Sequence, residues 1–385
     1  MLNRREFLQF AAATGPILAY PSLGWAKGAA PPKTLVFLHL RGGNDGLNTV
    51  IPFANPRYRE LRPTIGIDKN RVIKLGADLG LHPALGGFSA QWKKQRLAIV
   101  NGVGYPKPNY SHFRATEIWY TADPVQPPKH GWLGRALEAG DTKAPLRAVC
   151  LGKERPLSFN SSAQAGTATL TDFSRFRVPK SLNDVAALYE KAKSKPGELG
   201  KVGQAGSAAL KVARRISRLR PAGGPYYGRL GQTLRKVLAL IEAKLPLEII
   251  QIDFGGFDTH ANQSGSHNRL LAELGNNLNA YQNRLEQLGI ADQVTTVVFS
   301  EFGRRAAENI SGGTDHGSAG PVFILGKGVK PGFHGAYPSL DDLDRGNFKY
   351  TTDFRRIYAD LSERVLQVSP DKVLPTVHKP LGVFA

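Results

Sequence analysis

The sequence has 385 residues, 41% of them hydrophobic, which is enough for a full globular core in one large domain or two smaller ones. The single cysteine, Cys150, excludes a disulfide within the chain. With 51 basic and 31 acidic residues, the formal net charge is +20, which favours anionic partners such as substrates or envelope polymers, unless the charge is only solvated. No recognised nucleic-acid-binding motif accompanies the charge, so we expect no nucleic-acid partner.

The first residues predict an export signal. Arg4 and Arg5 stand ahead of a modestly apolar stretch at residues 10–23, which is the order of the charged and apolar regions of a signal peptide. Pro16 and Pro21 interrupt that stretch, and it is shorter than the roughly 20 apolar residues that a membrane-spanning helix needs. We therefore expect no stable transmembrane anchor. A chance arginine pair ahead of a buried helix is the alternative.

The arginine pair is typical of the twin-arginine pathway, which exports proteins that are already folded. Gly24 and Ala26 are small residues at the spacing that a signal peptidase accepts, so we place the signal peptide at residues 1–26 and the mature protein at 27–385. The predicted location is periplasmic or extracellular, and the twin-arginine export machinery is a predicted partner. Folded export allows a cofactor or metal ion to be loaded in the cytoplasm.

Continuous apolar runs predict buried strands, and the stretches between them, such as 266–288, have a helical pattern. The runs lie at 34–40, 97–100, 247–254, 294–299 and 321–325. Because they are continuous rather than alternating, both faces of each strand are expected to be covered. The sequence therefore predicts an α/β fold, a three-layer sandwich with a mainly parallel central sheet.

A helical insertion is expected at about 179–245, where the pattern holds no strand. Within it, residues 191–220 include nine basic residues and the single acid Glu198. We interpret this segment as a helical insertion with a basic face. A pair of solvated helices without a partner is the simpler alternative.

Polar clusters stand at the ends of four predicted strands. Three follow their strand and the fourth precedes its strand; in chain order they are Asn44-Asp45, Asp258-Thr259-His260, Ser300-Glu301 and Thr314-Asp315-His316. Strand ends of a parallel sheet meet at one edge, where ligands of α/β proteins bind. Carboxylates and imidazoles gathered there are ligands for zinc, manganese or a similar divalent ion. Asp315 as a turn residue, and Glu301 with Arg304 as a surface ion pair, are the alternatives.

Ser111 lies where a helix is expected to begin, after a turn rich in proline and glycine. The unpaired N–H groups and positive dipole end of a helix N-terminus favour an anionic oxygen, so Ser111 is a candidate nucleophile or phosphate-binding residue. A simple N-cap role is the alternative. His112, the next residue, is a candidate base or a helix-surface residue.

With these residues assembled, the chain resembles the domain-of-unknown-function 1501 family, twin-arginine-exported bacterial proteins related to the alkaline phosphatase and sulfatase superfamily. The matching stretches are Leu40-Arg41-Gly42-Gly43-Asn44-Asp45-Gly46-Leu47-Asn48, Ser111-His112-Phe113, Gly256-Phe257-Asp258-Thr259-His260, Ser300-Glu301-Phe302-Gly303-Arg304 and Gly313-Thr314-Asp315-His316-Gly317. The resemblance implies an alkaline-phosphatase-like fold. It also implies an enzyme that hydrolyses phosphate or sulfate esters. It also implies Ser111 as nucleophile, Asp45 as a metal ligand, one metal shared by Asp258, His260 and His316, and a second metal nearby.

Two positions depart from the superfamily pattern. Glu301-Phe302 stands where the superfamily usually has adjacent Asp and His, and Asp258 and His260 are spaced by one residue where the usual Asp and His are spaced by three. A single-ion site, a site for a hard ion held by oxygens and an inactive site therefore all stay open.

The leading hypothesis is an exported metal-dependent hydrolase of anionic esters, acting on a small-molecule or polymeric substrate. Its metal ligands would be Asp45, Asp258, His260, Glu301 and His316, holding zinc, manganese or calcium. Its catalytic residues would be Ser111, His112, Arg114 and Arg304, with the arginines steadying the substrate's anionic oxygens. The alternative is a catalytically degenerate envelope protein that binds anionic polymers through the basic insertion.

Overall fold

The computed structural model describes residues 33–126, 129–141, 144–162, 166–176 and 183–385. The predicted signal peptide at residues 1–26 lies outside the described residues, as does the beginning of the predicted insertion.

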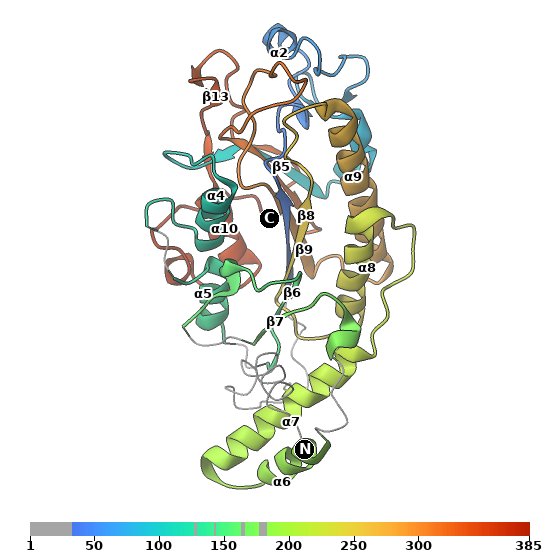
Figure 1. The fold of residues 1–385 in the computed structure, drawn as a ribbon, viewed down its shortest axis with the longest axis vertical. Helices are drawn as coiled ribbons and strands as arrows, with labels where there is room; N and C mark the ends of the chain where they lie inside the picture. Colours follow the sequence, from blue (N-terminus) through green and yellow to red (C-terminus); the bar gives the residue numbers. More distant parts are fainter. Residues whose placement is uncertain (1–32, 127–128, 142–143, 163–165, 177–182) are drawn as a thin grey trace.

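A nine-stranded sheet forms the centre of the described chain (Figure 1). Its strand order is β11-β5-β10-β9-β1-β8-β6-β7, and β14 pairs with the end of β5. The strands are β1 (Thr34–Arg41), β5 (Leu97–Gly104), β6 (Ala148–Leu151), β7 (Thr167–Thr169), β8 (Ile249–Gly255), β9 (Val294–Phe299), β10 (Gly320–Leu325), β11 (Gly332–His334) and β14 (Thr352–Asp353). Within this sheet only β10 is reversed, because it pairs antiparallel with both of its neighbours, β5 and β9, while the other pairings are parallel.

Helices cover both faces of the sheet (Figure 1). One layer holds α3 (Gly86–Lys93), α8 (Gly228–Glu242) and α9 (Gln263–Gln287), and the other holds α4 (His112–Thr121), α5 (Trp132–Ala139) and α10 (Phe354–Arg364). Alternate residues of β1 point to the two layers: Val36 and Leu38 join the first core cluster, and Leu35 and Phe37 the second. Burial on both faces explains the continuous apolar runs, and the predicted α/β fold with a mainly parallel sheet is confirmed.

Short elements complete the described chain. A third core cluster lies under the loops that follow β1 and includes Leu47, Tyr58 and Phe348. The elements there are β2 (Val50–Ile51), α2 (Pro56–Leu61), β3 (Ile73–Lys74), β4 (Gly80–Leu81), β12 (Leu343–Asp344) and β13 (Asn347–Phe348); the 3-10 helices are η1 (Pro83–Leu85), η2 (Leu157–Phe159), η3 (Phe173–Phe176) and η5 (Pro370–Lys372).

The stretch from residue 183 to 242 is helical, with α6 (Asn183–Ala192), α7 (Gly197–Ser217) and α8. Helix α8 belongs to the layer on the sheet, since it contacts both β8 and α9. Helices α6 and α7 instead pack on each other and lie at one end of the molecule (Figure 1). None of the helices in the described ranges is both long and apolar enough to cross a bilayer.

The reversed direction of β10 matters for the site. The clusters at Asp45, Asp258 and Glu301 follow the parallel strands β1, β8 and β9, whereas the cluster at His316 precedes β10. Because β10 runs the other way, its beginning lies at the same edge as the ends of the other three strands. The carboxyl end of β5 also reaches this edge and leads into α4, which begins at His112. One edge of the sheet thus receives all five segments.

Candidate metal site

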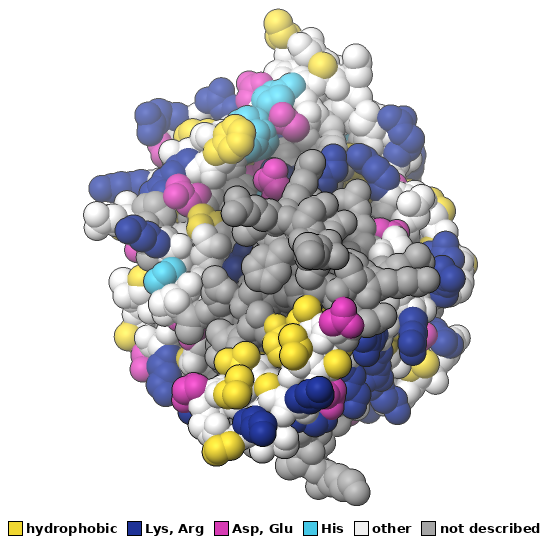
Figure 2. Space-filling view, turned by 60° about the horizontal axis from the view of Figure 1, so that its bottom comes forward, with side chains coloured by type: hydrophobic (Ala, Val, Ile, Leu, Met, Phe, Trp, Pro, Cys, Tyr) yellow, Lys and Arg dark blue, Asp and Glu magenta, His cyan; other side chains and the backbone are white. Residues whose placement is uncertain are grey.

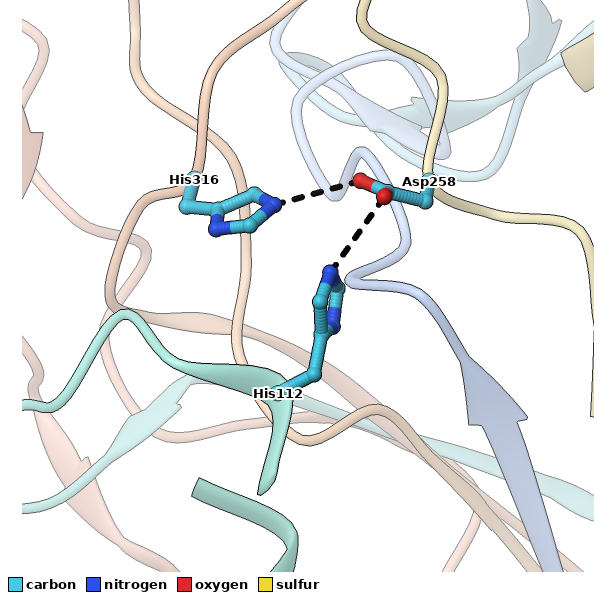
Figure 3. Close-up of side chains that lie close together, drawn as sticks. All are labelled: His112, Asp258 and His316. Carbon is cyan, nitrogen blue, oxygen red and sulfur yellow. Dashed lines mark hydrogen bonds and ion pairs between the residues drawn. The ribbon is translucent and has the colours of Figure 1, made fainter. Parts of the chain in front are cut away.

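His112, Asp258 and His316 converge at this edge, and their ligand atoms all lie within 4.8 Å of one another (Figure 3). Nε2 of His112 is 3.4 Å from Oδ2 of Asp258, and Nε2 of His316 is 3.2 Å from Oδ1 of the same carboxylate. The three residues come from the start of α4, the loop after β8 and the loop before β10. Two imidazoles and one carboxylate facing a common point form a typical ligand set for a divalent transition-metal ion.

His260 lies beside two of these three residues, Asp258 and His316. Its Nε2 lies 3.0 Å from Oδ1 of Asp258 and 3.0 Å from Nε2 of His316. Two nitrogens bound tetrahedrally to one zinc ion, each about 2.05 Å from the metal, lie about 3.3 Å apart. The spacing of His260 and His316 is therefore close to that of two ligands of a single ion.

The outer ring nitrogens of all three histidines face oxygen atoms. Nδ1 of His316 is 2.8 Å from the carbonyl oxygen of Tyr110, Nδ1 of His112 is 2.7 Å from Oε1 of Glu301, and Nδ1 of His260 is 3.5 Å from Oδ1 of Asp315. A carbonyl or carboxylate oxygen can only accept, so Nδ1 carries the proton in the first two cases. In a neutral ring this leaves the Nε2 lone pair directed at Asp258, which is the arrangement of metal-ligating histidines.

Nε2 of His112 supplies the observation that tests whether a metal fits. This atom is buried, and among the described residues it has no hydrogen-bond partner. A buried polar atom without a partner costs about 1–3 kcal/mol. A cation held between His112, Asp258 and His316 would satisfy it, so the residues present fit a metal ion.

Glu301 lies behind His112. Its carboxylate is buried and accepts from Nδ1 of His112, from Nε2 of His39 at 3.0 Å and from the backbone N–H of Gly42 at 2.8 Å. Burial acts to raise the pKa of Glu301, but the hydrogen bonds from His112 and His39 outweigh it and hold that pKa well below its usual range. The hydrogen bond between His112 and Glu301 also raises the pKa of His112. Glu301, predicted as a direct ligand, contacts the ring nitrogen of His112 that points away from Asp258, a position from which a carboxylate can orient the imidazole.

Asp45 is not part of this cluster. It is buried in an ion pair with Arg62, whose Nη1 and Nη2 donate to its two oxygens at 2.7 and 3.2 Å, and it also accepts from Gln263. Burial acts to raise the pKa of Asp45, but the Arg62 guanidinium outweighs it and lowers that pKa. The structure thus places Asp45 against Arg62 and apart from the group of His112, Asp258 and His316. Arg62 gave no sign of this role in the sequence.

Arg304 and Arg114 are both engaged within the protein. The buried Arg304 guanidinium donates to the carbonyl oxygens of Gly43, Gly42, Thr314 and Phe257, and to Oδ1 of Asp258 at 2.7 Å. It therefore joins the loops of the site to one another instead of facing a substrate. Arg114 donates to Glu117, one turn further along α4, at 2.6 Å.

The charge on Asp258 is strongly favoured. Burial acts to raise the pKa of Asp258, but its contacts with the Arg304 guanidinium and the His316 imidazole outweigh burial and hold that pKa at about 2. The carboxylate is therefore ionised at any physiological pH. Its Oδ1 faces Arg304, His260 and His316, and its Oδ2 faces His112.

Ser111 lies at the rim of the site. It is exposed, stands at the N-cap position of α4, and makes no side-chain capping hydrogen bond. Its neighbours in the chain are Tyr110, whose carbonyl oxygen accepts from His316, and His112. The predicted alternative of a capping hydroxyl is therefore not what the structure shows, and the Ser111 hydroxyl is left available for other chemistry.

Glycines after β1 allow the loops to approach the site closely. Gly42 has a φ of +118°, and a Cβ at this position would lie 2.4 Å from the backbone nitrogen of Asp258. A Cβ on Gly43 would collide with the ring of Phe302. Phe302 itself packs against the rings of His112 and His316, with centroids 4.8 and 4.7 Å away. Phe302 thus forms an aromatic wall at the position where the sequence resemblance implies a ligand of a second metal.

A model of one protein family, described as "Protein of unknown function (DUF1501)", matches residues 70–354. The chain belongs to this family. A search of curated proteins found no match. The matched residues of this DUF1501 protein include His112, Asp258, His260 and His316, and the predicted family is confirmed.

Solved structures resemble this DUF1501 protein only distantly. They include the PsFucS1 sulfatase from Pseudoalteromonas sp. (10% identity over 100% of this chain and 77% of that chain, TM-score 0.42) and the lipoteichoic acid synthase LtaP from Listeria monocytogenes (10% identity, 97% and 81%, TM-score 0.40). The alkaline phosphatase from the Antarctic bacterium TAB5 is another (9% identity, 78% and 93%, TM-score 0.31). With TM-scores below 0.5, these similarities decide nothing about the activity of this chain.

Proposed function

We propose that this protein binds one divalent metal ion through His112, Asp258, His316 and His260, and hydrolyses phosphate or sulfate esters at that site. The main support for the proposal is the buried Nε2 of His112, which makes no hydrogen bond and lies 3.4 Å from Asp258. The Nε2 atoms of two further histidines face the same carboxylate. Imidazole-rich sites favour zinc or a similar transition metal over calcium, which prefers six or more oxygen ligands.

A single ion is proposed rather than two. Each residue that a second ion would need is otherwise engaged: Asp45 pairs with Arg62, Glu301 accepts from His112 and His39, and position 302 is a phenylalanine. When bound, the ion would act as a Lewis acid on the ester and lower the pKa of a coordinated hydroxyl.

In this proposal the protein's own groups bind and attack the ester. Ser111 would supply the nucleophilic oxygen, because residue 111 is exposed, precedes His112 in the chain and makes no side-chain cap. Its attack on phosphorus or sulfur would break the ester bond and release the alcohol, which takes up the serine proton, and water would then hydrolyse the serine ester to free phosphate or sulfate. The unpaired backbone N–H groups in the first turn of α4 favour the anionic oxygens of a bound phosphate or sulfate group. Glu301 holds the ring of His112 in place, and Arg304 fixes Asp258 and the surrounding loops. The substrate class rests on the resemblance to the alkaline phosphatase and sulfatase superfamily.

We also propose that the protein acts outside the cytoplasm after twin-arginine export. The support is the arginine pair at Arg4 and Arg5 and the interrupted apolar stretch that follows it. Substitution of both arginines by lysine is expected to keep the protein in the cytoplasm, as judged by fractionation of the producing cells. Export unchanged by that substitution would contradict this part of the proposal.

Hydrolysis of p-nitrophenyl phosphate and p-nitrophenyl sulfate tests the activity. We expect Ser111→Ala to reduce turnover by roughly a thousandfold or more, because a covalent route ends without its nucleophile. The control is Ser174→Ala, which changes an exposed serine within η3. Full activity in Ser111→Ala would exclude this nucleophile.

A second candidate function is supported by the charge balance of the cluster. A protonated His112 lies between Glu301 and Asp258, and Arg304 neutralises Asp258, so the same residues are also compensated without a metal ion. In that case the protein would be a non-catalytic member of the family that binds an anionic polymer. Salt-sensitive binding to a sulfated polysaccharide, with neither a bound metal ion nor ester hydrolysis, would favour this candidate.

A further inference from the structure

The hairpin of α6 and α7 carries apolar side chains that nothing in the described chain covers. Leu188 on α6 is 62% exposed, and Leu199 and Val202 on α7 are 58% and 46% exposed. Leu199 and Val202 are three residues apart and so lie on the same side of α7. Single exposed apolar residues are ordinary, but three in one small hairpin are a feature that calls for a partner.

The same hairpin is strongly cationic. Residues 183–220 contain nine Lys and Arg residues and three acids. Two of the acids are already used within the hairpin, Glu190 by Lys193 and Glu198 by Lys201. Among the described residues no ion pair involves the remaining seven cations, which are Lys191, Lys195, Lys211, Arg214, Arg215, Arg218 and Arg220.

The cations lie on both sides of the exposed apolar residues along the chain. Lys191, Lys195 and Lys201 are within a few residues of Leu188, Leu199 and Val202, near the turn that joins the two helices. Further along α7, Lys211, Arg214, Arg215 and Arg218 follow helical spacing and line a groove beside α6. Figure 2 brings this end of the molecule forward and shows hydrophobic side chains next to Lys and Arg side chains.

The hairpin is a packed unit, so these side chains are held in place. The ring of Tyr189 lies directly on Gly206, where a Cβ would be only 2.6 Å from the ring atoms. Gly203 allows the backbone of α6 to approach α7 equally closely. The hairpin also lies at the end of the molecule away from α2 and β13 (Figure 1). The part of the molecule with α2 and β13 therefore does not prevent the hairpin from contacting a large surface.

We propose that the α6–α7 hairpin docks this protein on a bilayer surface that carries anionic lipids. Apolar side chains beside flexible lysines match such a surface, because the aliphatic groups enter the acyl boundary while the lysines reach the headgroup phosphates. A soluble anionic polymer would pair with the cations but would offer nothing to Leu188, Leu199 and Val202. The proposal is independent of the metal site and of the ester chemistry.

Co-sedimentation of the full chain with vesicles tests the proposal. We expect binding to vesicles that contain phosphatidylglycerol, weakening as salt rises, and little binding to vesicles of phosphatidylcholine alone. The double variant Leu199→Gln/Val202→Gln is expected to bind about tenfold less tightly or weaker still. Lys191→Gln/Lys195→Gln should lose about fivefold per lysine. Lys69→Gln/Arg71→Gln removes the same charge from the exposed segment before β3 and should bind like the original.

Several outcomes would overturn the proposal. One is no binding to the phosphatidylglycerol vesicles, and another is equal weakening by all three double variants. A loss with the lysine variant but not with the Leu199/Val202 variant would point to a soluble anionic polymer instead. Self-association that disappears in the Leu199/Val202 variant, with no vesicle binding, would point to a second copy of the chain. All substituted side chains are exposed, so thermal melting should be unchanged and folding defects can be separated from lost binding.

Discussion

At the scale of single residues, the carboxylates of the candidate site differ in the side chains that they contact. Three acids predicted as ligands lie at the same edge of the sheet, yet among them only Asp258 faces the Nε2 atoms of His112, His260 and His316. Glu301 orients His112, and Asp45 neutralises Arg62. Burial and the nearest cation decide these roles, and neither is visible in a local sequence motif.

Glu301→Gln tests the orienting role. The amide can accept from only one side and carries no charge, so His112 and His39 would no longer both be held. We expect metal affinity to fall about 10- to 100-fold, as for other partners of metal-bound histidines. Competition with a chromophoric chelator measures this directly. An unchanged affinity in a folded variant would show that Glu301 does not support the site.

Asp45→Asn tests whether Asp45 serves as the ion-pair partner of Arg62 and not as a metal ligand. The variant leaves Arg62 buried without its counter-ion, so we expect a loss of about 3–5 kcal/mol in the free energy of unfolding, measured with urea. Metal content should not change, because Asp45 is not a ligand in this account. Loss of the metal from folded Asp45→Asn would restore the role that the sequence resemblance implies.

The ion pair of Asp45 and Arg62 also makes the stability of the fold depend on pH. Because the pKa of Asp45 is lower in the folded state than its ordinary value of 3.8, its ionised form stabilises the fold. That contribution is fully present above about pH 3.8 and is lost as pH falls through the lower folded-state pKa. The free energy of unfolding, measured between pH 6 and about pH 2, should therefore change less with pH in Asp45→Asn than in the original protein.

At the scale of elements, the loop after β1 is the part that shapes the site. Gly42 at positive φ places this loop directly on the backbone of Asp258, and Arg304 joins it to the loops after β8 and before β10. The strand ends were predictable because continuous apolar runs mark buried strands, and polar residues follow them. The hydrogen bonds that hold the loops together were not predictable, because Arg62, Arg304 and the Tyr110 carbonyl contact residues that are far away in the sequence.

Gly42→Ala tests this loop. The new Cβ would strain a backbone at φ +118° and collide with Asp258, so we expect both a lower stability, by about 1–3 kcal/mol, and weaker metal binding. Gly382→Ala is the matched control: its φ is +85°, but a Cβ there meets nothing within 4 Å. The control should lose stability and keep its metal affinity. Equal effects of both variants on metal binding would contradict the role of Gly42.

At the scale of the whole molecule, the sheet was predictable as a class but not in one decisive detail. The spacing of apolar runs and helical segments indicated a mainly parallel sheet, and β10 alone is reversed in the sheet as described. That reversal brings a cluster located before a strand to the edge where the other clusters follow theirs. Apolar content does not encode strand direction, so the sequence could not show why His316 joins His112 and Asp258.

The proposed function requires that one metal ion binds between His112, Asp258, His260 and His316. The most direct measurement is metal content by mass spectrometry of protein purified without chelator, with Asp258→Ala/His316→Ala and Asp45→Asn alongside. We expect one divalent ion per chain, absent from the double variant and retained by Asp45→Asn. No ion in the original protein even after zinc or manganese is added back, or an ion that persists in the double variant, would contradict it.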